Sequence, residues 1–182
     1  LCMLMLDILR KLVQDVDNAP NLLAALDVIV QSVRDALNTE VCSIYLLDER
    51  NSRYVLMATH GLNPDAVGAV SLGLSEGLDG LVGQSEELIN LEDAASHPRF
   101  HYLPETGEDR YSSFLGVPIM NRRKVLGVLV VQQQEKRRFG QSEEAFLVTL
   151  SAQISGVVAH ARALGQLENL HAPKGGVASP RI

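Results

Sequence analysis

Hydrophobic side chains at both ends of the chain recur every three or four positions, which is the spacing of an amphipathic helix. Residues 5–16 carry one narrow apolar stripe and residues 22–37 a broader one, so the pattern predicts two helices there. Asn18 and Pro20 separate them, because Asn caps helix starts and Pro suits a first helical turn. Residues 139–170 predict a long C-terminal helix with Ser142 as its N-cap.

Between these helices the pattern changes to short, apolar, β-favouring runs. Strands are predicted at residues 41–48, 54–61, 69–74, 114–120 and 124–134, with a brief one near the start of 87–102. A short Gly-rich helix is predicted at residues 75–83. Hairpins join most of the strands and helices stand at both ends of the chain. We therefore expect an α+β fold, a central antiparallel sheet with the N- and C-terminal helices packed on one face.

Composition narrows the possible partners of this 182-residue chain. Sixteen basic against 22 acidic residues give a net charge of −6, which disfavours nucleic acid as a partner. The longest apolar run, Val125–Val131, is too short to cross a bilayer, so no membrane partner is expected. Two cysteines, Cys2 and Cys42, support no disulfide framework or zinc cluster and favour a reducing, cytoplasmic setting.

No residue pattern predicts a metal site or a catalytic centre. His97 and His101 have the spacing of two metal ligands on one helix face, but Pro98 lies between them and no third ligand follows. Cys42 lies in an apolar strand, where a cysteine is more often a small buried hydrophobe than an attachment point for a pigment. The chain also lacks a nucleophile elbow, a P-loop and a dinucleotide-binding fingerprint.

The order of the segments resembles a GAF domain, a small-molecule sensor fold related to PAS domains. The resemblance covers Pro20 to Leu164 and rests on EVCSIYLLD, EGLDGLVG, INLEDAASHPRF and SFLGVPIMNRRKVLGVLVVQQQ, followed by a long helix. More narrowly, TEVCSIYL, YVLMATHGL and SEEAFLVTL add a similarity to the N-terminal sensor domain of the nitrogen-system Enzyme I family of phosphoenolpyruvate–protein phosphotransferases.

This resemblance implies a division of the chain and a missing catalytic half. Residues 1–19 are expected to form a dimerisation helix, residues 20–170 the GAF sensor domain, and residues 171–182 a linker to absent catalytic modules. Ser179 stands where the family's phosphorylated histidine is needed, so this chain is not expected to be an enzyme or to hold a cofactor. The parent protein would use magnesium and phosphoenolpyruvate and phosphorylate a small carrier protein.

The same resemblance implies a ligand between the sheet and the irregular segments 78–83 and 91–113, an amino acid with glutamine favoured. Asp93 would pair with the ligand's amine, or alternatively cap a short helix ending near His97. Backbone N–H groups of Phe114–Gly116 and of the short helix would take its carboxylate. The predicted ligand-binding residues are Asp93, Tyr45, Phe100, Tyr111, Phe114, Leu115, Gly116 and Gly80.

Three other interpretations remain open. A cyclic-nucleotide site has weak support, because Asn121-Arg122, Phe139 and Glu143-Glu144 give only a loosened form of a family pattern that is largely a structural ion-pair device. A methionine-sulfoxide reductase would need several cysteines, and only Cys42 lies inside the domain. The third is a dimerisation and signal-relay module without a ligand.

The terminal helices also predict a homodimer. In the C-terminal helix an apolar seam alternates spacings of three and four, which is typical of a coiled coil or a helix covered by its own sheet. The seam consists of Leu147, Leu150, Ile154, Val157, Ala161 and Leu164. We expect the helix to run on through Leu167 and Leu170, whose side chains then need a second copy as partner.

Overall fold

The computed structural model describes residues 2–107, 111–168 and 170, so the predicted linker 171–182 lies outside the described residues. The helices are α1 (Cys2–Asp17), α2 (Leu22–Leu37), α3 (Gly77–Ser85) and α4 (Gln141–Ala163), with short 3₁₀ turns at Pro64–Ala66 and Ala94–Ser96. The strands are β1 (Val41–Asp48), β2 (Arg53–His60), β3 (Ser71–Gly73), β4 (Ile89–Leu91), β5 (Ser113–Asn121) and β6 (Lys124–Gln133).

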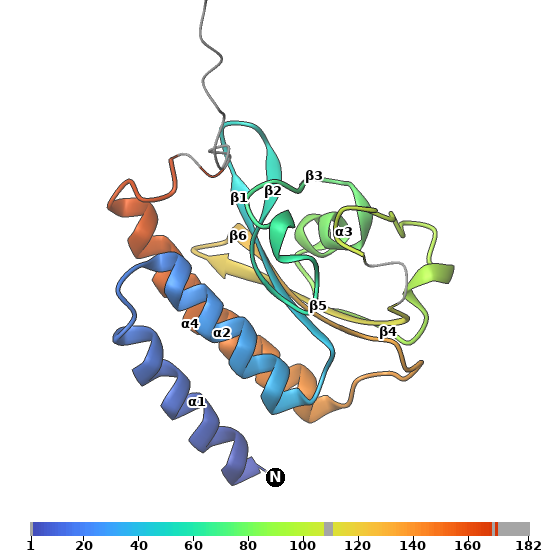
Figure 1. Cartoon of the computed structure of the whole chain (residues 1–182), viewed down its shortest axis with the longest axis horizontal. Helices are drawn as coiled ribbons and strands as arrows, with labels where there is room; N and C mark the ends of the chain where they lie inside the picture. Colours follow the sequence, from blue (N-terminus) through green and yellow to red (C-terminus); the bar gives the residue numbers. More distant parts are fainter. Residues whose placement is uncertain (1, 108–110, 169, 171–182) are drawn as a thin grey trace, which may run out of the picture.

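The six strands form one antiparallel sheet in the order β3-β2-β1-β6-β5-β4. Helices α2 and α4 lie against one face of it, with α1 outside them, and α3 with its neighbouring loops lies on the other face (Figure 1). This arrangement confirms the predicted α+β class. The sheet is therefore sandwiched between a helical layer and an irregular layer.

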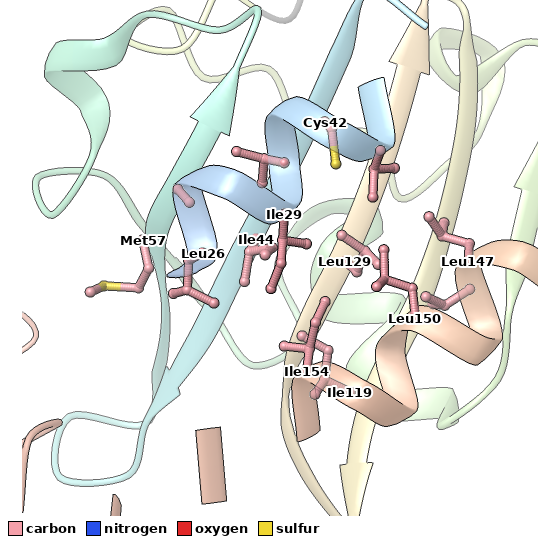
Figure 2. Close-up of a cluster of buried hydrophobic side chains, with 14 of the residues drawn as sticks. Leu26, Ile29, Cys42, Ile44, Met57, Ile119, Leu129, Leu147, Leu150 and Ile154 are labelled. Carbon is pink, nitrogen blue, oxygen red and sulfur yellow. The ribbon is translucent and has the colours of Figure 1, made fainter. Parts of the chain in front are cut away.

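Side chains alternate between these two layers along each strand. On β6, Leu129 and Val131 pack in the helix-side core, whereas Val128 and Val130 pack in the α3-side core. Figure 2 shows the helix-side core, where apolar side chains of α2 and α4 meet those of the sheet. Alternation thus assigns each strand residue to one layer, and only one of these layers contains the predicted ligand segments.

The second helix begins at Leu22, as predicted, but its capping residue differs. Asn21, not Asn18 or Pro20, is its N-cap, since Asn21 Oδ1 accepts a hydrogen bond from Ala24 N at 2.9 Å. Asn18 instead ends the first helix, because its N–H donates to Gln14 O at 3.1 Å. The position of the break was correct, but its capping residue was wrong.

The C-terminal helix differs from the prediction at both ends. Gly140, not Ser142, is the N-cap, and its N–H donates to Glu143 Oε1 at 2.9 Å. The helix ends at Ala163 because Gly165 adopts a left-handed conformation with φ of 72°. It does not run on to Leu170, whose side chain turns back into the helix-side core.

Most of the predicted seam of α4 faces the chain's own sheet, but its last member, Leu164, lies just beyond the helix and is exposed. Leu147, Leu150 and Ile154 are buried in the helix-side core (Figure 2). In length and composition α4 also passes as a membrane-spanning helix. Because its apolar face is already covered by α2 and the sheet, we interpret α4 as a core helix.

Candidate functional site

Three of the predicted ligand residues meet in the α3-side core. Tyr45 on β1 and Phe114 on β5 are buried there, and Phe100 packs against the same cluster from the loop after β4. The remaining members of this layer are mainly aliphatic, so it forms an apolar packed layer between α3 and the sheet. Of the three aromatic side chains expected to wall a ligand site, Tyr45, Phe100 and Tyr111, the first two are therefore brought together and Tyr111 is not.

Two predicted residues lie elsewhere. The side chain of Leu115 packs in the helix-side core, on the opposite face of the sheet from Phe114, because neighbouring residues of β5 face opposite layers. The prediction for Leu115 concerned its backbone N–H and not this side chain. Tyr111 forms a separate small cluster with Val41 and Leu62, and its hydroxyl donates to Gly61 O at 3.3 Å.

The backbone of Phe114–Gly116 does not present free donors to a carboxylate, contrary to the prediction. This part of β5 pairs with β4 on one side and β6 on the other, so its N–H groups lie inside hydrogen-bonded ladders. Gly116 serves packing instead, since a Cβ there would lie 2.8 Å from Val82 Cγ2 of α3. Gly80 is similarly confined, with an added Cβ only 2.9 Å from the carbonyl carbon of Ser75.

Asp93 already has a cationic partner. Its Oδ2 accepts a hydrogen bond from Lys136 Nζ at 2.7 Å, and its side chain is 32% exposed. That hydrogen bond holds the pKa of the Asp93 carboxyl below its usual value. Asp93 is the N-cap residue of the 3₁₀ turn Ala94–Ser96, which ends next to His97 as the alternative interpretation expected, although its side chain makes no cap hydrogen bond there. Contact between Asp93 and a ligand stays a prediction.

Asp79 was missed by the sequence analysis. It lies in the first turn of α3, is only 6% exposed, and its Oδ1 has no hydrogen-bond partner among the described residues. Burial raises the pKa of the Asp79 carboxyl from 3.8 to about 7, against the opposing effect of a hydrogen bond to its own backbone. The signal that could have found it is a single acid within the otherwise Gly-rich and apolar helix 77–83.

A hollow of about 430 Å³ opens beside this layer. Ala66 and Val70 belong both to its wall and to the α3-side core, and Leu103 packs against that core. The other lining residues are Asn63, Asp65, Ala69, Ser71 and Glu105. Its volume is in the range of small-molecule sites, although none of the predicted ligand residues lines it.

Glu143 and Glu144 form a structural latch at the start of α4, which fits the expected ion-pair role. Both carboxylate oxygens of Glu143 accept from Arg137 at 2.8 Å. Asn90 Nδ2 donates to Glu144 Oε1 at 2.6 Å and to Phe139 O at 2.8 Å. The hydrogen bond to Arg137 lowers the pKa of Glu143. Both glutamates are therefore held in contacts within the fold, and this pair gives no support to a cyclic-nucleotide site.

The histidines also have local partners. His97 Nδ1 accepts from Arg99 N at 3.1 Å, and His101 Nε2 lies 3.1 Å from Glu76 Oε1. Within the described ranges no group of three or more His, Cys, Asp or Glu side chains is placed to hold a metal ion. Cys42 is fully buried, and burial raises the pKa of its thiol, which disfavours the reactive thiolate.

Comparison with known proteins identifies the family. The sequence model of the GAF domain family matches residues 21–158. The GAF domain of an Acinetobacter phosphoenolpyruvate-protein phosphotransferase is 56% identical, with a TM-score of 0.83 over 90% of this chain and 98% of that one. The corresponding domain from Coxiella burnetii is 48% identical, with a TM-score of 0.87 over 91% and 98%. The chain belongs to the GAF domain family.

Within that family it is a GAF domain of the kind that phosphoenolpyruvate-protein phosphotransferases carry. The phosphoenolpyruvate-dependent phosphotransferase system protein of Escherichia coli K12 is 48% identical over 158 residues, which are 87% of this chain and 21% of that protein. The chain thus spans about a fifth of the length of the curated relatives it matches. A free methionine-R-sulfoxide reductase from Neisseria meningitidis, solved with its substrate, is 18% identical with a TM-score of 0.76 over 89% and 92%, and shows the shared fold alone.

Proposed function

We propose that this chain is the regulatory domain of a cytoplasmic phosphoenolpyruvate–protein phosphotransferase of the nitrogen system, and that it binds an amino acid, with glutamine favoured. The observation that carries the proposal is the α3-side layer, where aromatic walls, buried polar oxygens and an adjoining hollow of about 430 Å³ occur together. A buried acceptor without a donor is costly, and a small ligand with N–H groups would satisfy it.

In this proposal the chain regulates and the rest of the parent protein catalyses. Among the described residues no group of three or more His, Cys, Asp or Glu side chains is placed to hold a metal ion, which fits a regulatory role. We assign these groups, and the transfer of phosphate to a small carrier protein, to the parent's other modules.

A thermal-shift screen of the chain tests the proposal. We expect glutamine to raise the melting temperature in a concentration-dependent way, because a ligand that binds only the folded state stabilises it. Glutamate, 2-oxoglutarate and cyclic nucleotides serve as comparison compounds. A screen in which no amino acid raises the melting temperature contradicts amino-acid sensing.

The predicted role of Asp93 has its own test. Asp93→Ala is expected to weaken glutamine binding at least several-fold in calorimetry, because it removes the carboxylate that pairs with the ligand's amine in this proposal. The melting temperature of the ligand-free chain should change little, since a solvent-exposed ion pair adds little to stability. Lys136→Ala is the matched control, because it frees Asp93 and should not weaken binding. Unchanged binding in Asp93→Ala shows that the carboxylate has only a structural role.

The second candidate function is dimerisation and signal relay without a ligand. Two observations favour it. Met3, Leu4 and Leu6 leave an apolar face of α1 exposed to solvent. At the other end of the helical layer, Arg162 of α4 donates to Leu47 O at 2.6 Å and pairs with Glu49 at 2.7 Å, which joins α4 to the β1–β2 hairpin.

A further inference from the structure

Three exposed cations lie together at the hairpin between β5 and β6. This cluster, the basic turn, consists of Arg122, Arg123 and Lys124. Asn121 pairs with Lys124, so the two arginines alone form the turn, and their φ values of 48° and 64° are those of a type I′ turn. Such a turn normally takes asparagine and glycine, because larger side chains are disfavoured in the left-handed region. The arginines stand where the backbone favours other residues, which points to a role outside the fold.

The basic turn also has no carboxylate partner among the described residues. The other basic run of the chain, at the far end of β6, is different. There Lys136 pairs with Asp93 at 2.7 Å and Arg137 pairs with Glu143 at 2.8 Å. One basic run therefore serves the fold, whereas the other leaves three positive charges facing solvent on a chain of net charge −6.

The basic turn lies at the end of the sheet from which the polypeptide continues. Leu46 of β1 pairs with Gly127 of β6, so the last residues of β1 lie beside the first residues of β6. The C-terminal end of α4 reaches the same end of the sheet (Figure 1). Beyond α4, Glu168 lies 3.8 Å from Arg50 in the β1–β2 turn. Whatever follows in the polypeptide therefore starts from the end that carries the basic turn.

We propose that the basic turn docks on an acidic surface of the module that follows this domain in the parent protein. The inference rests on the proposed function for the existence of that module, since the chain spans about a fifth of the length of its curated relatives. Residues 171–182 span at most about 40 Å even when fully extended. A module tethered at that distance is present at high effective concentration, so a weak ionic contact is enough to hold it.

Two other partners fit the basic turn less well. Nucleic acid is disfavoured because the chain is acidic overall and three adjacent cations cover only a short stretch of a phosphate backbone. A second copy of the chain finds exposed apolar side chains on α1, away from the basic turn. An acidic protein surface matches the charge of the basic turn, and such contacts set specificity and orientation more than affinity.

Zero-length cross-linking of the parent protein, with the products identified by mass spectrometry, tests this contact. A carbodiimide joins a lysine amine to a carboxylate as an amide, with loss of water, only where the two groups already touch. Lys136 and Asp93, 2.7 Å apart, provide the internal positive control. We expect Lys124 to be joined to aspartate or glutamate residues beyond residue 182. The yield should fall several-fold in about 0.5 M salt, because salt screens exposed charges.

Charge reversal separates the basic turn from net charge. Arg122→Glu/Arg123→Glu should lower the cross-linking of Lys124 beyond residue 182 at least several-fold and leave the internal control unchanged. Lys11→Glu/Arg138→Glu is the matched control, because it changes the net charge equally at exposed positions elsewhere. Its cross-links from Lys124 should match those of the unmodified protein.

A second variant tests why the arginines are there. Arg122→Asn/Arg123→Gly gives the turn the residues that its backbone favours. We expect it to raise the melting temperature of the 182-residue chain while lowering the cross-linking of Lys124 in the parent protein. A lower melting temperature means that the arginines stabilise the fold, which removes the basis of the proposal.

The outcomes separate this inference from the proposed function. If Lys124 is joined only to its own domain, or to a second copy when isotope-labelled and unlabelled proteins are mixed, the docking is wrong and amino-acid sensing stands. If the cross-link depends on the arginines but glutamine fails in the thermal-shift screen, the docking stands and glutamine sensing fails. Cross-links that survive both salt and charge reversal contradict an ionic contact. Binding of duplex DNA that requires the arginines assigns the basic turn to a phosphate backbone and also overturns the docking.

Discussion

Asp79 places an ionisable carboxyl group in an apolar layer, and this makes the stability of the domain depend on pH. Burial raises its pKa from 3.8 to about 7, so the folded state holds the proton where the unfolded chain has lost it. Stability from this group is therefore fully present below pH 3.8 and is lost as pH rises to about 7. The full loss is roughly 4 kcal/mol, at 1.36 kcal/mol per pH unit.

Asp79→Asn should remove this dependence, since the amide does not titrate. In urea unfolding, we expect the stability of the variant relative to the parent chain to rise by about 2 kcal/mol between pH 5.5 and pH 8. The comparison cancels titration of the other ionisable groups around α3, which are Tyr45, Tyr54, Glu76, Glu86 and His101. A constant difference between variant and parent across this range means that Asp79 is already ionised in the folded state below pH 5.5.

At this scale the sequence predicted which residue types build the layer but not which of them face it. Tyr45 lies in the expected layer because large aromatic residues in apolar strands are mostly buried. The backbone N–H groups of Phe114–Gly116 were expected to be available to a ligand because the sequence does not show that this strand is paired on both sides. Asp79 was missed because an acid in a first helical turn is ordinarily explained by the helix dipole.

Among the elements, the latch before α4 depends on Asn90 of the edge strand β4. Its amide donates to Phe139 O and Glu144 Oε1 and accepts from Phe139 N at 3.1 Å, and its side chain is buried. Asn90→Ala leaves these groups without partners, so we expect a loss of about 2–4 kcal/mol in the free energy of unfolding. Denaturant unfolding measures it.

Asn51→Ala provides the comparison for the Asn90 variant. Asn51 lies in the exposed β1–β2 turn, where its amide donates to Asp48 Oδ2 at 2.8 Å. Asp48 is buried but keeps the hydrogen bonds that Arg50 N and Asn51 N donate to its Oδ1, so the loss should be smaller, about 1 kcal/mol. If the two variants lose similar amounts of unfolding free energy, the hydrogen bonds of Asn90 do not hold β4 against α4.

Periodicity predicted the order of the elements correctly, since both apolar spacings are strong over 8–23 residues in α2, α4, β1 and β6. The ends of the helices were less predictable. Gly140 caps α4 through a backbone N–H to Glu143, which leaves no side-chain signature at the cap itself. Gly165 ends the same helix inside an apolar repeat, and a single glycine there is compatible with either continuation or a stop.

For the whole molecule, the structure changes the basis of the expected homodimer without testing it. Ala161 and Leu170 are covered by the chain's own core, so they no longer require a partner. Large exposed apolar side chains lie instead on α1, at Met3, Leu4 and Leu6, and on the outer side of α4, at Val148. Between them runs a mainly apolar groove of about 320 Å³, lined by Met5, Leu6, Leu9, Ser142, Ala145, Phe146 and Thr149.

This groove and its rim predict self-association through α1 and α4 of two copies. Leu6 and Val148 are 61% and 47% exposed in a single chain, so glutamate at both positions should leave the fold intact and oppose docking of a second copy. Light scattering at high micromolar concentration should give about twice 19.8 kDa for the parent chain and about 19.8 kDa for Leu6→Glu/Val148→Glu. Leu74→Glu, at an exposed position near α3, should remain dimeric. A parent mass near 20 kDa, or a double variant that stays dimeric, contradicts this interface.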